Sequence, residues 1–168
     1  VQIELGKFEA SETILDKIVF YLSSLSPPKR RNVGKEDVLK GKEIFYKSEC
    51  TSCHTPKYVT SKKAKASFLK YQLIWPYTDL LLHDMGNDLA DKDMNGNITN
   101  KEWKTPPLWG LGLTKIVNPN ATYLHDGRAR NLLEAILWHG GEASKSIEKL
   151  SNLYGTEIKY LIKFLESL

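Results

Sequence analysis

Two cysteines and one histidine form the motif with the clearest chemistry in this sequence. They lie in Cys50-Thr51-Ser52-Cys53-His54, and the chain has no other cysteine. A C-x-x-C-H motif is typical of covalent haem attachment, because two thiols about one turn apart can bond to the two vinyl groups of one porphyrin. His54 would then supply the proximal nitrogen ligand of the iron. The motif therefore predicts one covalent haem c, held by Cys50, Cys53 and His54.

Other interpretations of the two thiols need features that the sequence does not offer. A thioredoxin-like C-x-x-C belongs on a βαβ pattern, and no such pattern surrounds this one. A structural zinc site needs further Cys or His at ligand spacing, whereas the four histidines are dispersed. A disulfide would close only a very short loop. A small disulfide-closed binding domain is the non-redox alternative.

Length and composition indicate one globular domain with an added arm. The chain has 168 residues, of which 41% are hydrophobic and 26% are charged, so it resembles neither disordered nor membrane proteins. No apolar run approaches the roughly 18–20 residues that span a bilayer. The chain begins at Val1 without a visible signal peptide, which indicates a trimmed or excised product. Haem attachment to thiols implies maturation outside the cytoplasm, so we predict a periplasmic location.

The charge is moderately basic and unevenly distributed. The formal net charge is +4, and a group of lysines follows the haem motif: Lys57, Lys62, Lys63, Lys65 and Lys70. This group is either a solvated surface or a docking patch for an acidic electron-transfer partner, because charge steers encounter. No nucleic-acid recognition motif accompanies it, so we do not expect nucleic-acid binding.

Hydrophobic periodicity predicts short helices joined by long loops. Helices are expected over residues 12–25, capped by Ser11, over 36–46, from Asn131 to Gly140-Gly141, and over 144–168 with an interruption near Gly155. Residues 57–70 and 86–100 are expected to be loops, and 71–76 a short extended segment. The predicted fold class is all-α with little regular structure, as expected where a cofactor replaces part of the core.

Several sequence strings resemble known haem proteins. Gly41-x-x-x-Phe45 before the haem motif, together with the helix at 158–168, resembles class I cytochrome c domains. More specific strings are DLLLHDMG (79–86), EWKTPPLWGLG (102–112), LHDGRAR (124–130) and HGGEA (139–143). Together they resemble the di-haem oxidoreductases, also called thiol oxidoreductases. That family is similar to di-haem cytochrome c peroxidases and to the di-haem enzyme that matures methylamine dehydrogenase. The resemblance covers about residues 20–168.

This resemblance implies a domain organisation and a function. Such proteins usually carry two C-x-x-C-H motifs, whereas this chain has one. It resembles their C-terminal haem domain, with residues 33–168 forming the cytochrome c-like unit and residues 1–32 a helix and linker that end a preceding domain. The implied function is electron transfer within or to a di-haem oxidoreductase, with a redox partner protein or a second haem domain as partner. The alternative is peroxidase-like catalysis at the haem, expected of a parent protein with two haems.

The second axial ligand of the iron has several candidates: His83, Met85, Met94, His125 and His139. In the related peroxidases, a string like 131–139 leads to an axial Met at the position of His139. The resemblance therefore implies that His139 is the distal ligand, with Met85 as the alternative. A thioether ligand would raise the reduction potential relative to imidazole. His139 could instead be a protonated histidine that faces the carbonyl end of a helix.

Other residues near these strings could support the haem. Arg128 and Arg130 are expected either to bind the haem propionates, since a guanidinium pairs well with a carboxylate, or to form surface ion pairs. Trp103, Trp109 and Trp138 could form the haem wall or belong to the packed core.

A second motif fits a calcium-binding loop. Residues 91–102 match the twelve-residue formula with oxygen ligands from the side chains of Asp91, Asp93, Asn95 and Glu102 and the backbone of Asn97. Gly96 permits the sharp turn of such a loop. No clear entering helix precedes it, and Pro106-Pro107 prevent a long exiting helix. The sequence therefore leaves two interpretations, a structural calcium site and an ordinary Asp/Asn/Gly turn.

Overall fold

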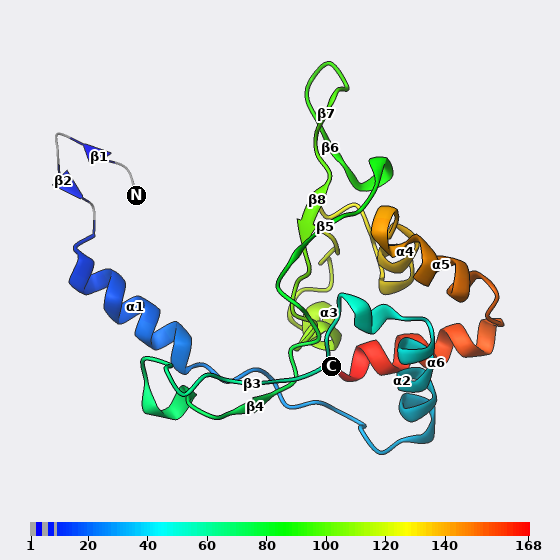
Figure 1. Cartoon of the computed structure of the whole chain (residues 1–168), viewed down its shortest axis with the longest axis horizontal. Helices are drawn as coiled ribbons and strands as arrows, with labels where there is room; N and C mark the ends of the chain where they lie inside the picture. The colour runs from blue at the N-terminus through cyan, green and yellow to red at the C-terminus, as the bar shows by residue number, and fades with distance from the viewer. Residues whose placement is uncertain (1–2, 5–6, 9) are drawn as a thin grey trace.

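The computed structural model describes residues 3–4, 7–8 and 10–168, with side chains from residue 10 onward. Over these residues the chain is mostly helical with a few short strands. The main body of the molecule lies around α2 (Glu36–Lys47) and α6 (Gly155–Ser167), at the lower right of Figure 1. No helix in the described part of the chain is long and apolar enough to cross a membrane.

The hydrophobic core forms where α2 and α6 pack together. Gly41 permits this packing, because a Cβ atom there would collide with the Tyr160 carbonyl and with Phe164. Phe45 then packs on Phe164, with ring centroids 5.2 Å apart. The buried core residues are Val38, Ile44, Phe45, Tyr77, Leu150, Leu161, Phe164, Leu165 and Leu168. This core fixes the end of α2, from which the chain enters the haem motif.

The first helix, α1 (Glu12–Ser24), confirms the predicted segment and its cap. The Ser11 hydroxyl accepts a hydrogen bond from the Ile14 N–H. None of the α1 residues is buried, and its apolar side chains are exposed. The helix ends before Pro27-Pro28, as predicted from the conformational restriction of proline. Before it, β1 (Ile3–Glu4) and β2 (Lys7–Phe8) pair antiparallel.

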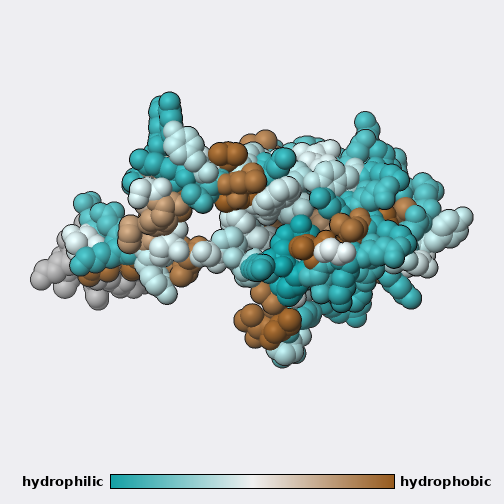
Figure 2. Space-filling view, turned by 90° about the horizontal axis from the view of Figure 1, so that it is seen from below, coloured by the Kyte–Doolittle hydropathy of each residue, from teal (hydrophilic) through white to brown (hydrophobic). Residues whose placement is uncertain are grey.

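A long projection, here called the arm, consists of α1 and residues 57–75. Within it β3 (Tyr58–Val59) pairs with β4 (Leu73–Ile74), and Phe68 at its far end contacts Phe20 of α1 edge to face, with centroids 5.9 Å apart. The arm extends away from the helical body (Figure 1), and apolar side chains lie on its surface (Figure 2). The domain division predicted at residue 32 stays a prediction: of the arm, α1 lies before this residue and β3 and β4 lie after it.

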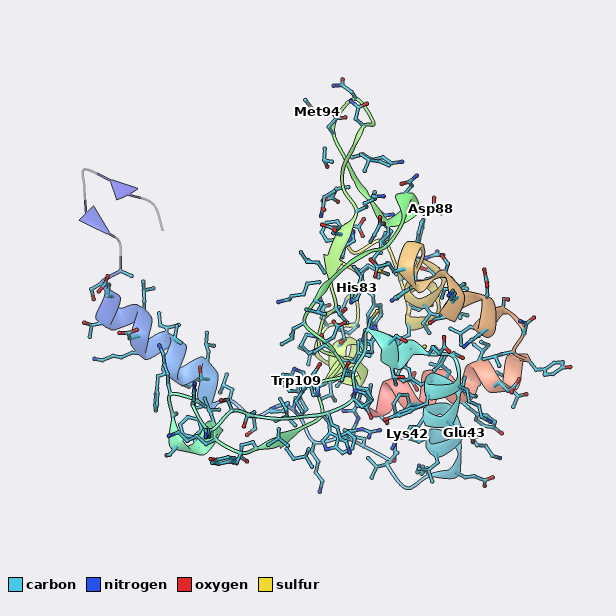
Figure 3. The ribbon with its side chains drawn as sticks, viewed as in Figure 1. Lys42, Glu43, His83, Asp88, Met94 and Trp109 are labelled. Atoms are coloured by element: carbon cyan, nitrogen blue, oxygen red, sulfur yellow. The ribbon has the colours of Figure 1, made fainter. Side chains whose placement is uncertain are left out.

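Two further strand pairs follow in the chain, and the second projects from the molecule at the top of Figure 1. β5 (Leu82–Asp84) pairs with β8 (Glu102–Lys104), and β6 (Asp91–Lys92) forms a hairpin with β7 (Ile98–Asn100). Met94 is at the exposed tip of this hairpin (Figure 3). The loop prediction for residues 86–100 was wrong at β6 and β7. Segments of two or three residues are too short to show an alternating pattern.

The C-terminal half contains four of the helices. A short α3 (Thr114–Val117) precedes α4 (Leu132–Leu137), which Asn131 caps by accepting a hydrogen bond from the Glu134 N–H at 2.9 Å. The helix ends before the two glycines that were predicted to end it. α5 (Ser144–Ser151) and α6 follow, with a break before Gly155, as predicted. The turn after α4 brings residues 139–143 against β5.

Candidate functional site

The two cysteines lie on one tight turn directly after α2. Glu49 adopts a left-handed conformation with φ of 60°, which ends the helix and starts a 3-10 turn over Cys50–Ser52. The His54 N–H then donates a hydrogen bond to the Cys50 carbonyl at 2.9 Å. Both thiols are free, and burial raises the pKa of Cys50 to about 11. The turn thus places two uncharged thiols beside each other and His54 immediately after them.

The imidazole of His54 is fixed in one orientation by the backbone. Its Nδ1 lies 2.9 Å from the carbonyl oxygen of Tyr77, and because a carbonyl only accepts, Nδ1 carries the proton and donates it. Burial lowers the pKa of His54 to about 4, so the ring is neutral at pH 7. The lone pair is therefore on Nε2. This is the state in which an imidazole binds a metal.

His139 lies opposite His54 and has the same chemical state. The two ring centroids are 6.4 Å apart, with an angle of 47° between the ring planes. The Nδ1–H of His139 donates to the Ala135 carbonyl at 2.7 Å, one helical turn earlier in the chain. Burial also lowers the pKa of His139. Both rings are thus neutral. In each, Nδ1 makes the hydrogen bond that fixes the ring, and Nε2 takes no part in that bond.

This donor set fits an iron porphyrin bound through thioethers. A metal ion with bonds of about 2.0–2.1 Å to one nitrogen of each imidazole places the ring centroids roughly 6 Å apart. The separation of 6.4 Å between His54 and His139 agrees with that value. Metal-binding histidines usually donate their other N–H to a carbonyl or carboxylate, as both do here. Cys50 and Cys53 supply the two thiols on the His54 side.

His83 is in a different state. Its Nε2 lies 2.7 Å from Asp79 Oδ2, and its Nδ1 lies 2.8 Å from Glu142 Oε2. Hydrogen bonds to Glu142 and Asp79 raise the pKa of His83. Both nitrogens of the imidazole are therefore engaged with carboxylates, and neither is free to bind a metal. Cys53 is its neighbour, with the ligand-type atoms of Cys53, Asp79 and His83 all within 4.8 Å of one another.

The family follows from comparison with known proteins. Residues 3–168 match the family model described as "Di-haem oxidoreductase, putative peroxidase". The chain belongs to the di-haem oxidoreductase family. No curated protein and no solved structure matches it. The match confirms the resemblance found in the sequence strings, and it extends over α1 as well as the helical body. The family implies haem, and the Cys50/Cys53 pair fits a c-type attachment motif.

The two methionine candidates lie in different surroundings. Met94 is fully exposed at the tip of the β6–β7 hairpin, and Figure 3 shows it far from the labelled His83. Met85 is half-buried; its N–H donates to the Lys101 carbonyl at 2.9 Å, and its own carbonyl lies beside Gly140. Of the predicted axial ligands of this di-haem oxidoreductase chain, His139 is the one whose ring lies beside that of His54, with centroids 6.4 Å apart.

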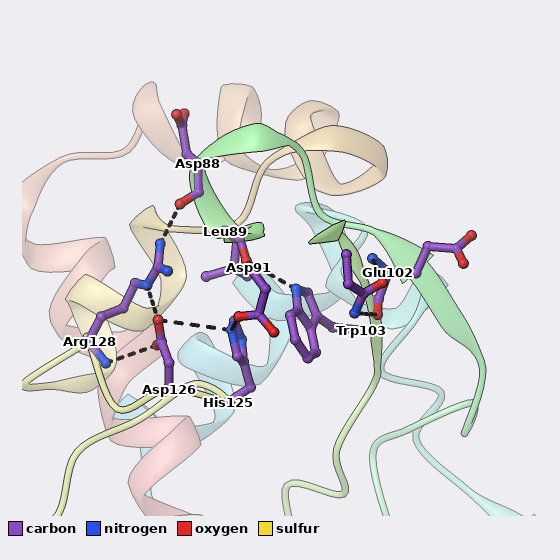
Figure 4. A network of polar contacts seen from close by, with 9 residues as sticks. Asp88, Leu89, Asp91, Glu102, Trp103, His125, Asp126 and Arg128 are labelled. Carbon is purple, nitrogen blue, oxygen red and sulfur yellow. Dashed lines mark hydrogen bonds and ion pairs between the residues drawn. The ribbon is translucent and has the colours of Figure 1, made fainter. Parts of the chain in front are cut away.

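His125 stacks on Trp103 rather than facing the cysteines. The two ring centroids are 3.5 Å apart and the planes are nearly parallel, at 12°. Its Nε2 lies 3.2 Å from Asp91 Oδ1, and the indole N–H of Trp103 donates to the Leu89 carbonyl at 3.0 Å (Figure 4). These contacts join residues 123–130 to the β5–β8 sheet.

The two arginines of the LHDGRAR string are both engaged with protein carboxylates. Arg128 binds Asp126 at 2.5 Å and the Asp88 carbonyl, and its guanidinium lies 4.9 Å from the ring centroid of Trp138. Arg130 pairs with Glu134 at 2.5 Å on the exposed surface. The structure therefore shows their internal ion pairs, and propionate binding by Arg128 and Arg130 stays a prediction.

A polar cluster that the sequence did not suggest lies near the C-terminal end of α6. Within the described chain, Arg30 Nε, Arg31 Nη1 and the Tyr77 hydroxyl are buried without a hydrogen-bond partner. The Arg30 guanidinium also lies 5.8 Å from the Tyr77 ring centroid. The sequence alone places Arg30 and Arg31 in a linker and gives them no further role. The role of Tyr77 could not be foreseen, because it binds His54 through a backbone carbonyl that has no sequence signature.

The predicted calcium ligands do not converge. Asp93 Oδ1 accepts the N–H groups of Asn95 and Asn97, at 2.9 and 2.8 Å, and so stabilises its own turn. Asp91 contacts His125, and Glu102 lies on β8 opposite Asp84, with its carboxylate directed away from Asp91 in Figure 4. Among the described residues, the set of Asp91, Asp93 and Glu102 forms no close group of ligand atoms.

Proposed function

We propose that this chain is a cytochrome c-like (class I) electron-transfer domain of the di-haem oxidoreductase family. It carries one haem c, attached through Cys50 and Cys53, with His54 as the proximal and His139 as the distal iron ligand. The observation that supports this most directly is the pair of neighbouring neutral imidazoles, whose centroids are 6.4 Å apart. When bound, the haem supplies one-electron redox chemistry.

The protein's contribution is to hold the two imidazoles in place. Each Nδ1–H is donated directly to a backbone carbonyl, at Tyr77 and at Ala135, and this hydrogen bond sets the orientation of the ring. The Tyr77 residue is fully buried, and Ala135 lies within α4. Ligands held in this way change little between oxidation states, which favours electron transfer over substrate binding.

A peroxidase-like activity is the second candidate, supported by the description of the family. It would need a vacant or displaceable position on the distal side of the iron. In the proposed site His139 would fill that position, and its ring is held by a hydrogen bond to Ala135 of α4. We therefore assign electron transfer to this chain and propose that peroxidase chemistry belongs to a second haem of the parent protein.

The partner and location are further parts of the proposal. A di-haem family and a single C-x-x-C-H motif together point to a second haem on another domain or protein. Residues 57–75 contain five lysines and no acidic residue, and we propose that this part of the arm approaches an acidic face of the partner. We also propose that the protein matures outside the cytoplasm and is located in the periplasm. Cell fractionation would test this location.

The decisive experiment is spectroscopy of the ferric haem protein. Absorption and electron paramagnetic resonance spectra should show one low-spin haem with two histidine ligands, and a pyridine haemochrome assay should show two thioether bonds. A charge-transfer band typical of methionine ligation would instead favour Met85 as the distal ligand. A high-spin spectrum would contradict the carrier proposal and favour the peroxidase-like alternative. Absence of a Soret band would contradict haem binding altogether.

A further inference from the structure

The segment from Tyr77 to His83 contacts His54 at one end and, at the other, the turn that follows His139. On the proximal side, the Tyr77 carbonyl accepts the Nδ1–H of His54. The next residue, Thr78, donates its N–H to the Thr55 carbonyl at 3.0 Å and its hydroxyl to the Thr105 carbonyl at 2.6 Å. Because Tyr77 and Thr78 are fully buried, this part of the segment is firmly attached to His54.

The connection continues through side chains toward the distal side. Asp79 follows Thr78 directly and accepts a hydrogen bond from His83 Nε2 at 2.7 Å. His83 Nδ1 donates to Glu142 Oε2 at 2.8 Å. The other carboxylate oxygen of Glu142 accepts the Asp84 N–H at 3.0 Å. Glu142 is therefore fully engaged with the strand that carries His83.

Glu142 belongs to the turn that follows His139. This turn rests closely on β5, because a Cβ atom at Gly141 would collide with the Asp84 carbonyl and the Gly86 nitrogen. Gly140 is also in close contact with the Met85 carbonyl. The backbone on the C-terminal side of His139 is thus held against β5, while α4 holds the N-terminal side through Ala135.

We propose that His83 is a positioning residue that holds the distal His139 in place by joining Asp79, on the proximal segment, to Glu142, on the distal turn. The inference rests on the proposed ligation of the iron by His54 and His139. Hydrogen bonds between an imidazolium and a carboxylate are charge-assisted and stronger than neutral ones. Loss of this link should leave the haem attached but make the His139 ligand easier to displace.

The test measures ligand displacement in the ferric haem protein. Cyanide can bind the iron only after His139 leaves, so its binding rate under saturating conditions reports how firmly His139 is held. We expect His83→Gln and Glu142→Gln each to increase this rate by about tenfold, the factor that corresponds to one charge-assisted hydrogen bond. The double variant should add little to either single one, because both remove the same link.

His125→Gln is the matched control. His125 also contacts a carboxylate, Asp91, and in addition stacks on Trp103, but it lies outside this connection. Its cyanide rate should equal that of the unmodified protein. Equal rates in His83→Gln, Glu142→Gln and the unmodified protein would overturn the inference while the bis-histidine spectrum stands. A spectrum without two histidine ligands would overturn the proposed function and this inference with it.

Discussion

The ring centroids of His54 and His139 lie 6.4 Å apart, although the two residues come from opposite halves of the chain. Each ring is neutral and donates its Nδ1–H to a backbone carbonyl. The Nε2 atom of each ring therefore carries a lone pair. This symmetry favours an electron carrier, because a peroxidase site requires one axial side of the iron to be open. The proposal that this protein transfers electrons rather than catalyses a reaction therefore depends mainly on His139.

Replacement of His139 by alanine should convert a low-spin haem into a high-spin one. The Cys50 and Cys53 attachments and His54 remain, so the haem should be retained while the distal position opens. Addition of free imidazole should restore the low-spin spectrum, because it replaces the missing ligand. His125→Ala is the control and should keep the low-spin spectrum. A low-spin spectrum in His139→Ala without added imidazole would show that another residue, such as Met85, is the distal ligand.

Substitution of Gly41 by alanine should destabilise the domain without touching the iron ligands. The added Cβ atom would collide with the Tyr160 carbonyl and with Phe164, where α2 and α6 cross. Overpacking of this kind typically costs about 1–3 kcal/mol, measurable as a lower urea midpoint. Gly34→Ala is the matched control, since no atom lies within 4 Å of a Cβ at that position. Equal midpoints for the two variants would contradict the close approach of the helices.

The helices and the haem motif could be predicted from sequence because their signals are local. Ser11, Asn131 and Gly155 mark helix boundaries by capping or by flexibility, and the structure confirms each boundary to within a few residues. The fold class was less complete, since the all-α prediction omitted the short strands. Strands of two or three residues are specified by pairing with distant segments, as β5 is by β8, and such pairing leaves little pattern in either segment.

The candidate site was predictable only in part. The C-x-x-C-H spacing indicates the thiols and His54 directly, and the family resemblance pointed to His139. The supporting contacts depend on the tertiary fold: the Tyr77 carbonyl, and the link from Asp79 through His83 to Glu142. The calcium formula rests on residue types and carries no information on the flanking structure. Its residue types match the motif, but without the flanking helices of an EF-hand the chain forms a hairpin instead.

Alanine at Gly141 should disturb the distal ligand more than alanine at Gly96, although both glycines have positive φ. The values are 53° and 82°, so both substitutions carry the cost of a left-handed residue, about 1 kcal/mol. Gly96 has open space around its Cβ position, whereas a Cβ at Gly141 would collide with β5. We expect faster cyanide binding in Gly141→Ala alone. Equal rates in both variants would mean that the turn after His139 does not need its contact with β5.

Charge reversal on the arm should weaken electron transfer to an acidic partner. Lys62 and Lys63 are exposed in a segment without acidic residues. We expect Lys62→Glu/Lys63→Glu to slow reduction by an acidic one-electron carrier protein roughly tenfold at low ionic strength, and salt to abolish the difference. The control is Lys145→Glu/Lys159→Glu, which changes the net charge equally on other exposed sites. Equal slowing of both variants in stopped-flow measurements would show a net-charge effect without a docking patch.

Calcium should not bind the β6–β7 hairpin tightly, although its sequence fits the formula. Binding would require Asp91 to leave His125, Asp93 to release the N–H groups of Asn95 and Asn97, and the Glu102 carboxylate to turn toward Asp91. These rearrangements would disrupt the contacts that shape the hairpin and join it to residues 123–130. We therefore expect no saturable heat when chelator-treated haem protein is titrated with calcium in a calorimeter. A saturable heat that Asp93→Ala removes, and that Asp88→Ala leaves intact, would show that the loop rearranges into a calcium site.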